Sequence, residues 1–280
     1  MSQSPLHQSA PAGLHHWLDT VDNANEPSIR VLTLDAVRCV VKRSLKLHAL
    51  MSWLRRGIFY ARAWFLALSC KLFLGEFPRP SVLLRNGLSF ETARLLNFYQ
   101  AGCRVPAVWW HEPDLLVMEY VGDNIADTLR ASEAGAYPDL IQAASADMAN
   151  FHARGFWHGG AQLRNVTLKD GQVWRIDFEE NIGEALSLPL AQAYDVYQML
   201  SSLMSMRGMP VHLMPELGQL MLNIYFTANP NPDVRQALQR LARCFAAVAW
   251  LFRPVLRLFS SRDIQGFLRV TDILHVLRKR

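Results

Sequence analysis

Residues 158–165 read HGGAQLRN, residues 174–179 read WRIDFE, and the pair Asp170-Gly171 lies between them. An Asp-Gly pair flanked by apolar residues is a strong signal for a tight β-hairpin turn. The stretch therefore predicts a loop that ends in Asn165, then a hairpin, then an apolar strand that ends in Asp177. An amide beside a carboxylate offers the oxygen ligands that hold Mg²⁺ against nucleotide phosphates.

Upstream, residues 30–43 (RVLTLDAVRCVVKR) predict two β-strands. Apolar and polar side chains alternate there with a period of two, and β-branched residues are frequent, which is typical of strands. Asp35 and Ala36 interrupt the alternation, so we expect a turn at these two residues. Lys42 then lies near the end of the second strand.

Residues 89–100 (SFETARLLNFYQ) predict a helix, with Ser89 as its N-cap and the acidic Glu91 in its first turn. Two further strands are expected, at residues 107–110 and 115–120. These elements complete the part of the chain that we expect to be rich in β-structure.

Gly122 breaks the chain after these strands, and helical periodicity returns at residues 125–130 and 140–154. From Ala191 onward the sequence predicts helices only. This order indicates an α+β fold with a small β-rich N-lobe and a helical C-lobe. The predicted division is a disordered or loosely ordered lead-in at 1–28, an N-lobe at 29–121 with an apolar, basic helical insert at 44–76, and a C-lobe at 122–280 with the loop and hairpin at 157–180.

Taken in order, these features resemble the protein-kinase-like superfamily over roughly residues 30 to 205. The resemblance rests on the ordered set, since no single motif in it is specific. It implies a two-lobed protein-kinase-like fold with ATP and Mg²⁺ as cofactors. The roles it implies are Lys42 binding the α- and β-phosphates, Glu91 orienting Lys42, Met118 as gatekeeper, Glu119 to Val121 as the hinge at the adenine, Asn165 and Asp177 as metal ligands, His158 packing the loop, and Asp195 bonding the loop backbone.

Several of these residues also have an ordinary structural interpretation, which the sequence leaves open. Lys42 fits an edge-strand lysine, Glu91 fits a favourable charge at a helix start, and Asp177 fits a turn residue that ends a strand. The spacing between Asn165 and Asp177 favours the metal role for the aspartate. His158 is expected to be structural rather than a base.

Four positions depart from the family pattern. The usual loop has an Asp two residues after the His, where it accepts the proton of the substrate hydroxyl, and this chain has Gly160 there. Gln162 stands where a Lys or His is common, and Glu179, followed by Glu180, stands where a Gly is usual. No GxGxxG sequence precedes Lys42.

Three interpretations of these departures follow. The chain is an active but atypical kinase in which Glu179 or Glu180 replaces the missing carboxylate, a pseudokinase that binds nucleotide and scaffolds an envelope or signalling complex, or an enzyme completed by a carboxylate from another loop. We favour an enzyme with Lys42, Asp177 and Glu179 as its catalytic set, because phosphoryl transfer depends mainly on positioning. Nucleotide and metal binding are expected in all three interpretations.

Within the superfamily, the compact loop and the short distance from Asp177 to Asp195 resemble two groups of small kinases. These are the bacterial lipopolysaccharide-core and Kdo sugar kinases, and the RIO-like group that includes the KEOPS kinase subunit. The resemblance implies that the acceptor is a sugar hydroxyl of a lipopolysaccharide-type glycolipid at the cytosolic membrane face. A protein substrate, as for a Ser/Thr kinase, is the alternative.

Composition sets the wider bounds. The 280 residues are 51% hydrophobic and 19% charged, which excludes a wholly disordered chain and suits a buried core. The four cysteines have no CxxC or CxxH spacing, so neither a zinc site nor a disulfide framework is predicted, and we expect a cytoplasmic location. The polar residues 1–13 lack the pattern of a secretory signal.

Residues 36–75 contain eight Lys or Arg and no acidic side chain, interleaved with aromatic and aliphatic residues. Arg62 and Lys71 interrupt the apolar run, so we do not expect a transmembrane helix. Two interpretations stay open: a basic amphipathic helix on the anionic, cytosolic face of the inner membrane, and a helix packed on the N-lobe. The high aliphatic content argues against a nucleic-acid surface.

Overall fold

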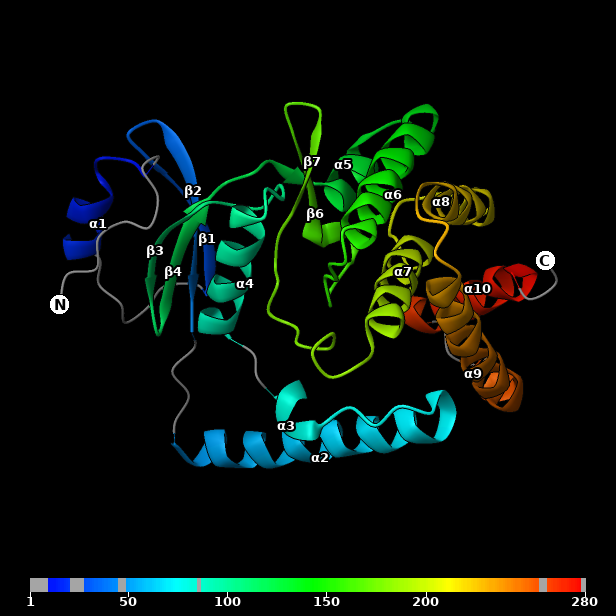
Figure 1. Cartoon of the computed structure of the whole chain (residues 1–280). Coiled ribbons are helices and arrows are strands. Elements are labelled where there is room, and N and C mark those ends of the chain that lie inside the picture. Colours follow the sequence, from blue (N-terminus) through cyan, green and yellow to red (C-terminus); the bar gives the residue numbers. More distant parts are fainter. Residues whose placement is uncertain (1–9, 21–27, 45–48, 85–86, 257–260, 278–280) are drawn as a thin grey trace.

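The computed structural model describes residues 10–20, 28–44, 49–84, 87–256 and 261–277 (Figure 1). It is a mixed α+β structure with a small antiparallel sheet in its N-terminal part and helices in its C-terminal part. The predicted fold class is confirmed, because this arrangement is consistent with a two-lobed, kinase-like fold.

The N-terminal sheet consists of β1 (Ile29–Leu34), β2 (Val37–Arg43), β3 (Val108–Glu112) and β4 (Leu115–Glu119). Its strand order is β1-β2-β4-β3, and all neighbouring strands are antiparallel. The predicted turn is confirmed, since Asp35 and Ala36 have φ angles of 49° and 64°, in the left-handed region used by tight hairpins. β2 is paired on both sides, so Lys42 is not an edge-strand lysine.

Helix α1 (Leu14–Thr20) covers one face of this sheet. Leu14 is buried against a cluster that includes Val41 and Trp109, and Trp17 packs beside it. The expectation of a loosely ordered lead-in over residues 1–28 is therefore corrected for this helix, because its apolar side chains bury against the sheet. Residues 1–9 and 21–27 of the lead-in lie outside the described part of the chain.

Helix α4 (Leu88–Gln100) lies on the other face, between the sheet and the helical part (Figure 1). Its buried Leu95 and Phe98 share a cluster with strand and C-terminal residues, so one core joins the two parts. The predicted Ser89 N-cap is wrong. The helix begins one residue earlier, at Leu88, and its N-cap is Gly87, whose φ of 103° any residue with a side chain would adopt only with strain.

The basic insert forms the long helix α2 (Ala49–Leu74), followed by the short α3 (Pro80–Leu83). α2 runs along one side of the molecule and packs on α3, which lies within the predicted N-lobe, and on α9 of the C-terminal part (Figure 1). Residues 45–48 of the predicted insert are outside the described chain. By length and composition alone, Gly57–Leu74 is apolar enough to cross a membrane, a test that core helices of soluble proteins also pass.

The C-terminal part starts with a small second sheet and two helices: β5 (Asp123–Asn124), α5 (Ile125–Ala131), the 3₁₀ turn η1 (Ala134–Ala136), α6 (Tyr137–Ala153), the 3₁₀ turn η2 (Leu163–Asn165), β6 (Val166–Lys169) and β7 (Gln172–Arg175). The predicted hairpin is confirmed, with Asp170 and Gly171 at φ 51° and 72° between β6 and β7.

The remaining helices are α7 (Leu188–Met204), α8 (Met214–Ala228), α9 (Pro232–Leu256) and α10 (Arg262–Leu277). α6 packs on α8, and α7 packs on α9 and α10, around a core of aliphatic and methionine side chains. The prediction of helices alone after Ala191 is confirmed for the described residues. This bundle supports the loop at 158–165, because Asp195 on α7 accepts hydrogen bonds from the loop backbone.

Candidate functional site

Lys42 joins three separate segments of the chain. Its Nζ donates to Oε1 and Oε2 of Glu91 at 2.7 and 3.0 Å, and to Oδ1 of Asp177 at 2.7 Å. Lys42 comes from β2, Glu91 from the first turn of α4, and Asp177 from the segment after β7. The structure thus brings together three residues that the sequence singled out, although they are far apart along the chain.

The environment of Lys42 keeps its side chain charged. Lys42 is 8% exposed and Glu91 is fully buried. Burial alone would lower the pKa of Lys42, but the charges of Glu91 and Asp177 outweigh it and raise this pKa above its ordinary value. Burial raises the pKa of the Glu91 carboxyl above its ordinary value, and the ammonium group of Lys42 counteracts part of this rise.

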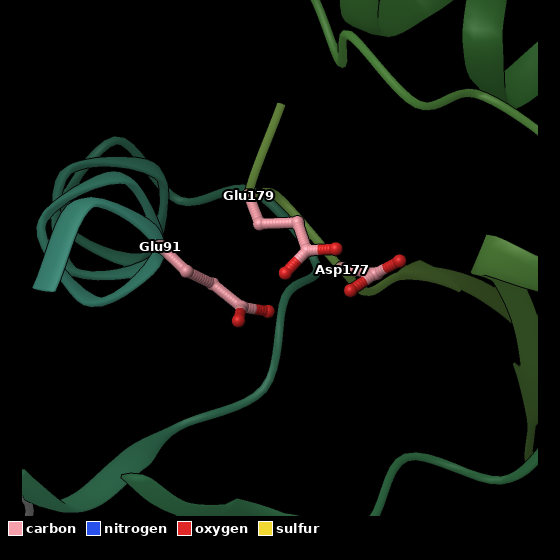
Figure 2. A group of neighbouring side chains, drawn as sticks. All are labelled: Glu91, Asp177 and Glu179. Carbon is pink, nitrogen blue, oxygen red and sulfur yellow. The ribbon is translucent and has the colours of Figure 1, made fainter. Parts of the chain in front are cut away.

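Asp177 has an unusual backbone conformation. Its φ is 69°, a region that few residues other than Gly adopt and that Asp tolerates better than most. The preceding residue is held in place, since the N–H of Ile176 donates to the carbonyl of Asn165 at 3.0 Å. The conformation turns the Asp177 carboxylate toward Glu91 and Glu179, and Figure 2 shows the three side chains converging, with one carboxylate oxygen from each within 4.8 Å of the others.

Asn165 lies at the end of η2 and is 6% exposed. Its Nδ2 donates to the carbonyl of Gly160 at 2.8 Å, which fixes the orientation of the amide and leaves Oδ1 as the acceptor atom. Asn165 and Asp177 line the same cleft. An amide oxygen beside a carboxylate is a donor set that suits a hard cation, so these two residues fit Mg²⁺.

The cleft between the two parts of the structure has a volume of about 780 Å³. That size is in the range of small-molecule and cofactor sites. The predicted site residues that line it are Lys42, Met118, Glu119, Val121, Asn165, Asp177 and Glu179. Glu91 is not among them, because it is fully buried and lies behind Lys42, which its carboxylate binds.

The segment predicted as a hinge is fixed against the second sheet. The Glu119 carboxylate accepts from Lys169 Nζ at 2.6 Å, and the Thr167 hydroxyl donates to the Val121 carbonyl at 2.7 Å. Gly122 has a φ of 91°, and a Cβ there would lie 2.1 Å from the carbonyl oxygen of Leu168. Only Gly allows this close approach, so the break at residue 122 has a steric cause.

Asp195 supports the loop from α7. Its carboxylate accepts from the backbone N–H groups of His158 and Gly159 at 2.6 and 2.7 Å, and it also contacts Nε2 of His152 at 3.3 Å. The His158 ring stacks on Phe178 with centroids 4.4 Å apart. Burial lowers the pKa of His158 to about 3, which keeps the ring neutral. The structure thus places Asp195 against the loop backbone and the His158 ring against Phe178.

Arg94 is an important residue that the sequence interpretation missed. Its guanidinium donates to the carbonyls of Trp157 and His158 at 2.7 and 2.8 Å, and to those of Phe178 and Glu180 at 3.3 and 3.2 Å. Burial lowers its pKa to about 10. Arg94 therefore joins α4 to both sides of the site. It lies three residues after Glu91, on the same helix face, and that spacing was the available signal.

A comparison with protein families gives a partial match. Residues 80–187 match the RIO domain. The RIO domain is part of the protein-kinase-like superfamily, and at the general level the match indicates a kinase-like, ATP-binding phosphotransferase. RIO kinase-like domains generally use ATP and Mg²⁺. No relative of the chain was found among curated proteins.

The RIO domain match covers less than half of the chain, and two of the site residues lie outside it. It includes Glu91, Asn165 and Asp177, but it begins after Lys42 and ends before Asp195. The contacts of Lys42 with Glu91 and Asp177, and those of Asp195 with the loop, connect these residues to the matched segment.

Proposed function

We propose that this protein transfers the γ-phosphate of ATP to a hydroxyl group in a Mg²⁺-dependent reaction. The observation that carries the proposal is the contact of Lys42 with both Glu91 and Asp177 at the wall of the cleft. A charged lysine oriented by a buried glutamate is suited to bind phosphates, and a carboxylate beside an amide is suited to bind their metal ion.

Each residue of the candidate site has a separate role in the proposed reaction. Lys42 binds phosphate oxygens, and Glu91 holds its ammonium group in place. Asn165 and Asp177 hold the Mg²⁺, which neutralises charge on the β- and γ-phosphates. The segment from Met118 to Val121 borders the adenine. Arg94 and Asp195 keep the loop in position, so that the phosphate to be transferred is aligned with the acceptor.

We propose as acceptor a sugar hydroxyl of a lipopolysaccharide-type glycolipid at the cytosolic face of the inner membrane. The resemblance of the loop to sugar kinases supports this acceptor. The exposed apolar side chains of α2 support a membrane location, because Leu68, Leu72 and Phe73 are 57%, 77% and 52% exposed. The alternative acceptor is a Ser or Thr hydroxyl of a protein, and the phosphate-transfer assay described below distinguishes the two.

One observation favours a second candidate function. Gly160 stands where the usual loop has its catalytic Asp, and the loss of this carboxylate is expected in a pseudokinase. Such a protein would bind ATP through Lys42, Asn165 and Asp177 and would scaffold an envelope or signalling complex. The two candidates share nucleotide binding and differ in turnover.

The test has two stages. Thermal unfolding with ATP, with and without Mg²⁺, measures nucleotide binding. Asp177→Asn should remove the Mg²⁺-dependent part of the shift, and Asp170→Asn in the nearby hairpin turn is the matched control. Transfer of label from γ-labelled ATP to a lipid extract or a protein extract then measures turnover. Stabilisation by ATP without transfer to either extract would overturn the enzyme and leave the pseudokinase, and no stabilisation would overturn both.

A further inference from the structure

A second cavity, of about 760 Å³, adjoins the cleft, and Glu179 lines both. One wall is apolar and includes Phe59 and Phe65 from α2 and Leu83 from α3. The lining also includes the polar side chains of Glu180 and Asn181, which follow Asp177 in the chain. The cavity therefore combines carboxylate and amide groups with a hydrocarbon surface, and it adjoins the cleft that the predicted metal ligands line.

The Glu180 carboxylate lies beside Gly160, the position at which the usual loop has its Asp. A Cβ built on Gly160 would be 3.7 Å from Cδ and 3.8 Å from Oε1 of Glu180. These are ordinary van der Waals separations, so a short side chain has room at residue 160, and a carboxylate on it would reach the space that Glu180 occupies. Glu179 instead turns its carboxylate toward Asp177 and Glu91 (Figure 2).

Asn181 provides an independent sign of a ligand. It is 3% exposed, and its Nδ2 donates to the Val82 carbonyl at 3.2 Å and to Glu184 Oε2 at 3.0 Å. Its buried Oδ1 has no hydrogen-bond partner in the described part of the chain. A buried acceptor without a donor costs free energy, and a hydroxyl group bound in the cavity, which Asn181 lines, would supply the donor.

We infer that this second cavity binds the acceptor, and that Glu180 takes the proton of its hydroxyl group in place of the absent loop Asp. The inference rests on the proposed phosphotransferase function and assigns to it a substrate site and a catalytic residue. The acceptor is an alcohol with an apolar portion. Hydroxyl groups suit Glu180 and Asn181, and a hydrocarbon chain or ring suits Phe59 and Phe65.

The transfer of the γ-phosphate forms one bond and breaks another. The hydroxyl oxygen forms a bond to the γ-phosphorus of ATP, and the bond from that phosphorus to the bridging oxygen of the β-phosphate breaks. The electron pair of the broken bond stays on ADP. The hydroxyl proton moves to a carboxylate oxygen of Glu180, which later releases it to water. The backbone of Glu180 is held for this task, because its carbonyl accepts from Arg94 Nη1 at 3.2 Å.

The first experiment compares two defined acceptors with the full-length protein and γ-labelled ATP. Octyl β-glucoside, below its micelle concentration, carries an apolar chain, and glucose is the matched alcohol without one. We expect kcat/KM for octyl glucoside to exceed that for glucose by about 10-fold or more, since each methylene in an apolar site contributes to discrimination. Equal values for the two alcohols, or transfer to neither from a protein that ATP stabilises, would overturn the inference.

Variants of the apolar wall test where the acceptor lies. Phe59→Ser should raise the KM for octyl glucoside and leave the KM for ATP unchanged. Tyr60→Ser is the matched control, because Tyr60 is the neighbouring exposed aromatic residue and does not line the cavity. An equal effect of the two substitutions would count against this site.

Variants at residues 180 and 160 test the proton acceptor. Glu180→Gln should lower kcat by about 10²- to 10⁴-fold, the usual contribution of a general base, while the thermal shift with ATP persists. Adding Gly160→Asp should restore much of this loss, whereas adding Gly160→Ala should not. Full activity of Glu180→Gln, or equal rescue by the two substitutions, would overturn the role of Glu180. Failure of the proposed function itself is distinct, because the unmodified protein would then transfer no phosphate to the lipid or protein extract, whereas failure of this inference alone leaves that transfer intact.

Discussion

The Nζ atom of Lys42 lies 2.7 Å from Oδ1 of Asp177, although 135 residues separate them along the chain. The same ammonium binds Glu91, so one cation holds together β2, α4 and the segment after β7. Lys42 lies outside the RIO domain match, whereas its two partners lie inside it. The contact therefore extends the candidate site beyond the matched segment and sets the position of the sheet relative to the loop.

Lys42→Met should both destabilise the fold and abolish nucleotide binding. The substitution leaves Glu91 as a buried charge without its partner, which lowers the free energy of unfolding by about 3 kcal/mol. In the double variant Lys42→Met/Glu91→Gln no unpaired charge remains, so most of this stability should return. ATP should stabilise neither variant. Urea unfolding and thermal shift measure the two effects, and an ATP shift in the double variant would contradict the role of Lys42.

Arg94→Met should lower the free energy of unfolding of the protein more than the same substitution of an exposed arginine does. It removes the donor of hydrogen bonds to four carbonyl groups. A hydrogen bond from a charged group contributes about 1.5–3 kcal/mol to stability, and the four contributions do not simply add because they share one guanidinium. We expect a loss of about 3–5 kcal/mol in the free energy of unfolding. Arg130→Met is the matched control, because Arg130 pairs with Asp127 at the surface, and it should cost less than about 1 kcal/mol. Equal costs in urea unfolding would show that the carbonyl contacts contribute little.

His158 should make the protein less stable as the pH falls. Burial lowers its pKa in the folded state to about 3, from an unfolded value of 6.5, so between these values only the unfolded chain binds the proton. The free energy of unfolding should therefore fall from about pH 6.5 toward pH 3, by up to about 1.4 kcal/mol per pH unit from this residue. Burial lowers the pKa of His152 too, and this adds to the same trend.

The variant His158→Asn isolates this contribution. The amide can still accept the N–H of Gly160, which donates to His158 Nδ1 at 3.2 Å, but it does not titrate. Denaturant unfolding between pH 6 and 4 should show a slope smaller by up to about 1.4 kcal/mol per pH unit than in the unmodified protein. An unchanged slope would mean that His158 is not held neutral in the folded state.

The elements with local signals were predictable from the sequence. The turns at Asp35-Ala36 and Asp170-Gly171, the helix that carries Glu91 and the loop that ends in Asn165 each depend on neighbouring residues. Turn chemistry and short-range periodicity report such features directly. The fold class followed from their order, because that order resembles one superfamily.

The features that were missed depend on contacts between distant segments. Leu14 and Trp17 belong to the lead-in that was expected to be disordered or loosely ordered, and their side chains bury apolar surface only because the helix packs on the sheet. The Arg94 contacts reach residues more than 60 positions away. The Ser89 cap failed for a different reason, since the Gly87 conformation shifted the helix start by one residue. Local patterns carry no information about the partners of a buried side chain.

The exposed apolar face of α2 should bind anionic membranes. Leu68, Leu72 and Phe73 are more than half exposed, and full burial of such a side chain is worth about 1.5–3 kcal/mol. Residues 44–75 of the insert are also free of acidic side chains, so a negatively charged surface attracts them. We expect the protein to float with vesicles that contain an anionic lipid, more than with neutral vesicles, and less at high salt.

A triple substitution of Leu68, Leu72 and Phe73 by Ser tests this face. It removes three side chains that would insert together, so the partition coefficient should fall by about 100-fold or more. The matched control replaces three exposed apolar residues on other faces, Tyr99, Leu188 and Val211, and should leave flotation unchanged. Unchanged ATP stabilisation in both variants shows that the fold survives. If the two triple variants float alike, α2 is not the membrane-binding surface.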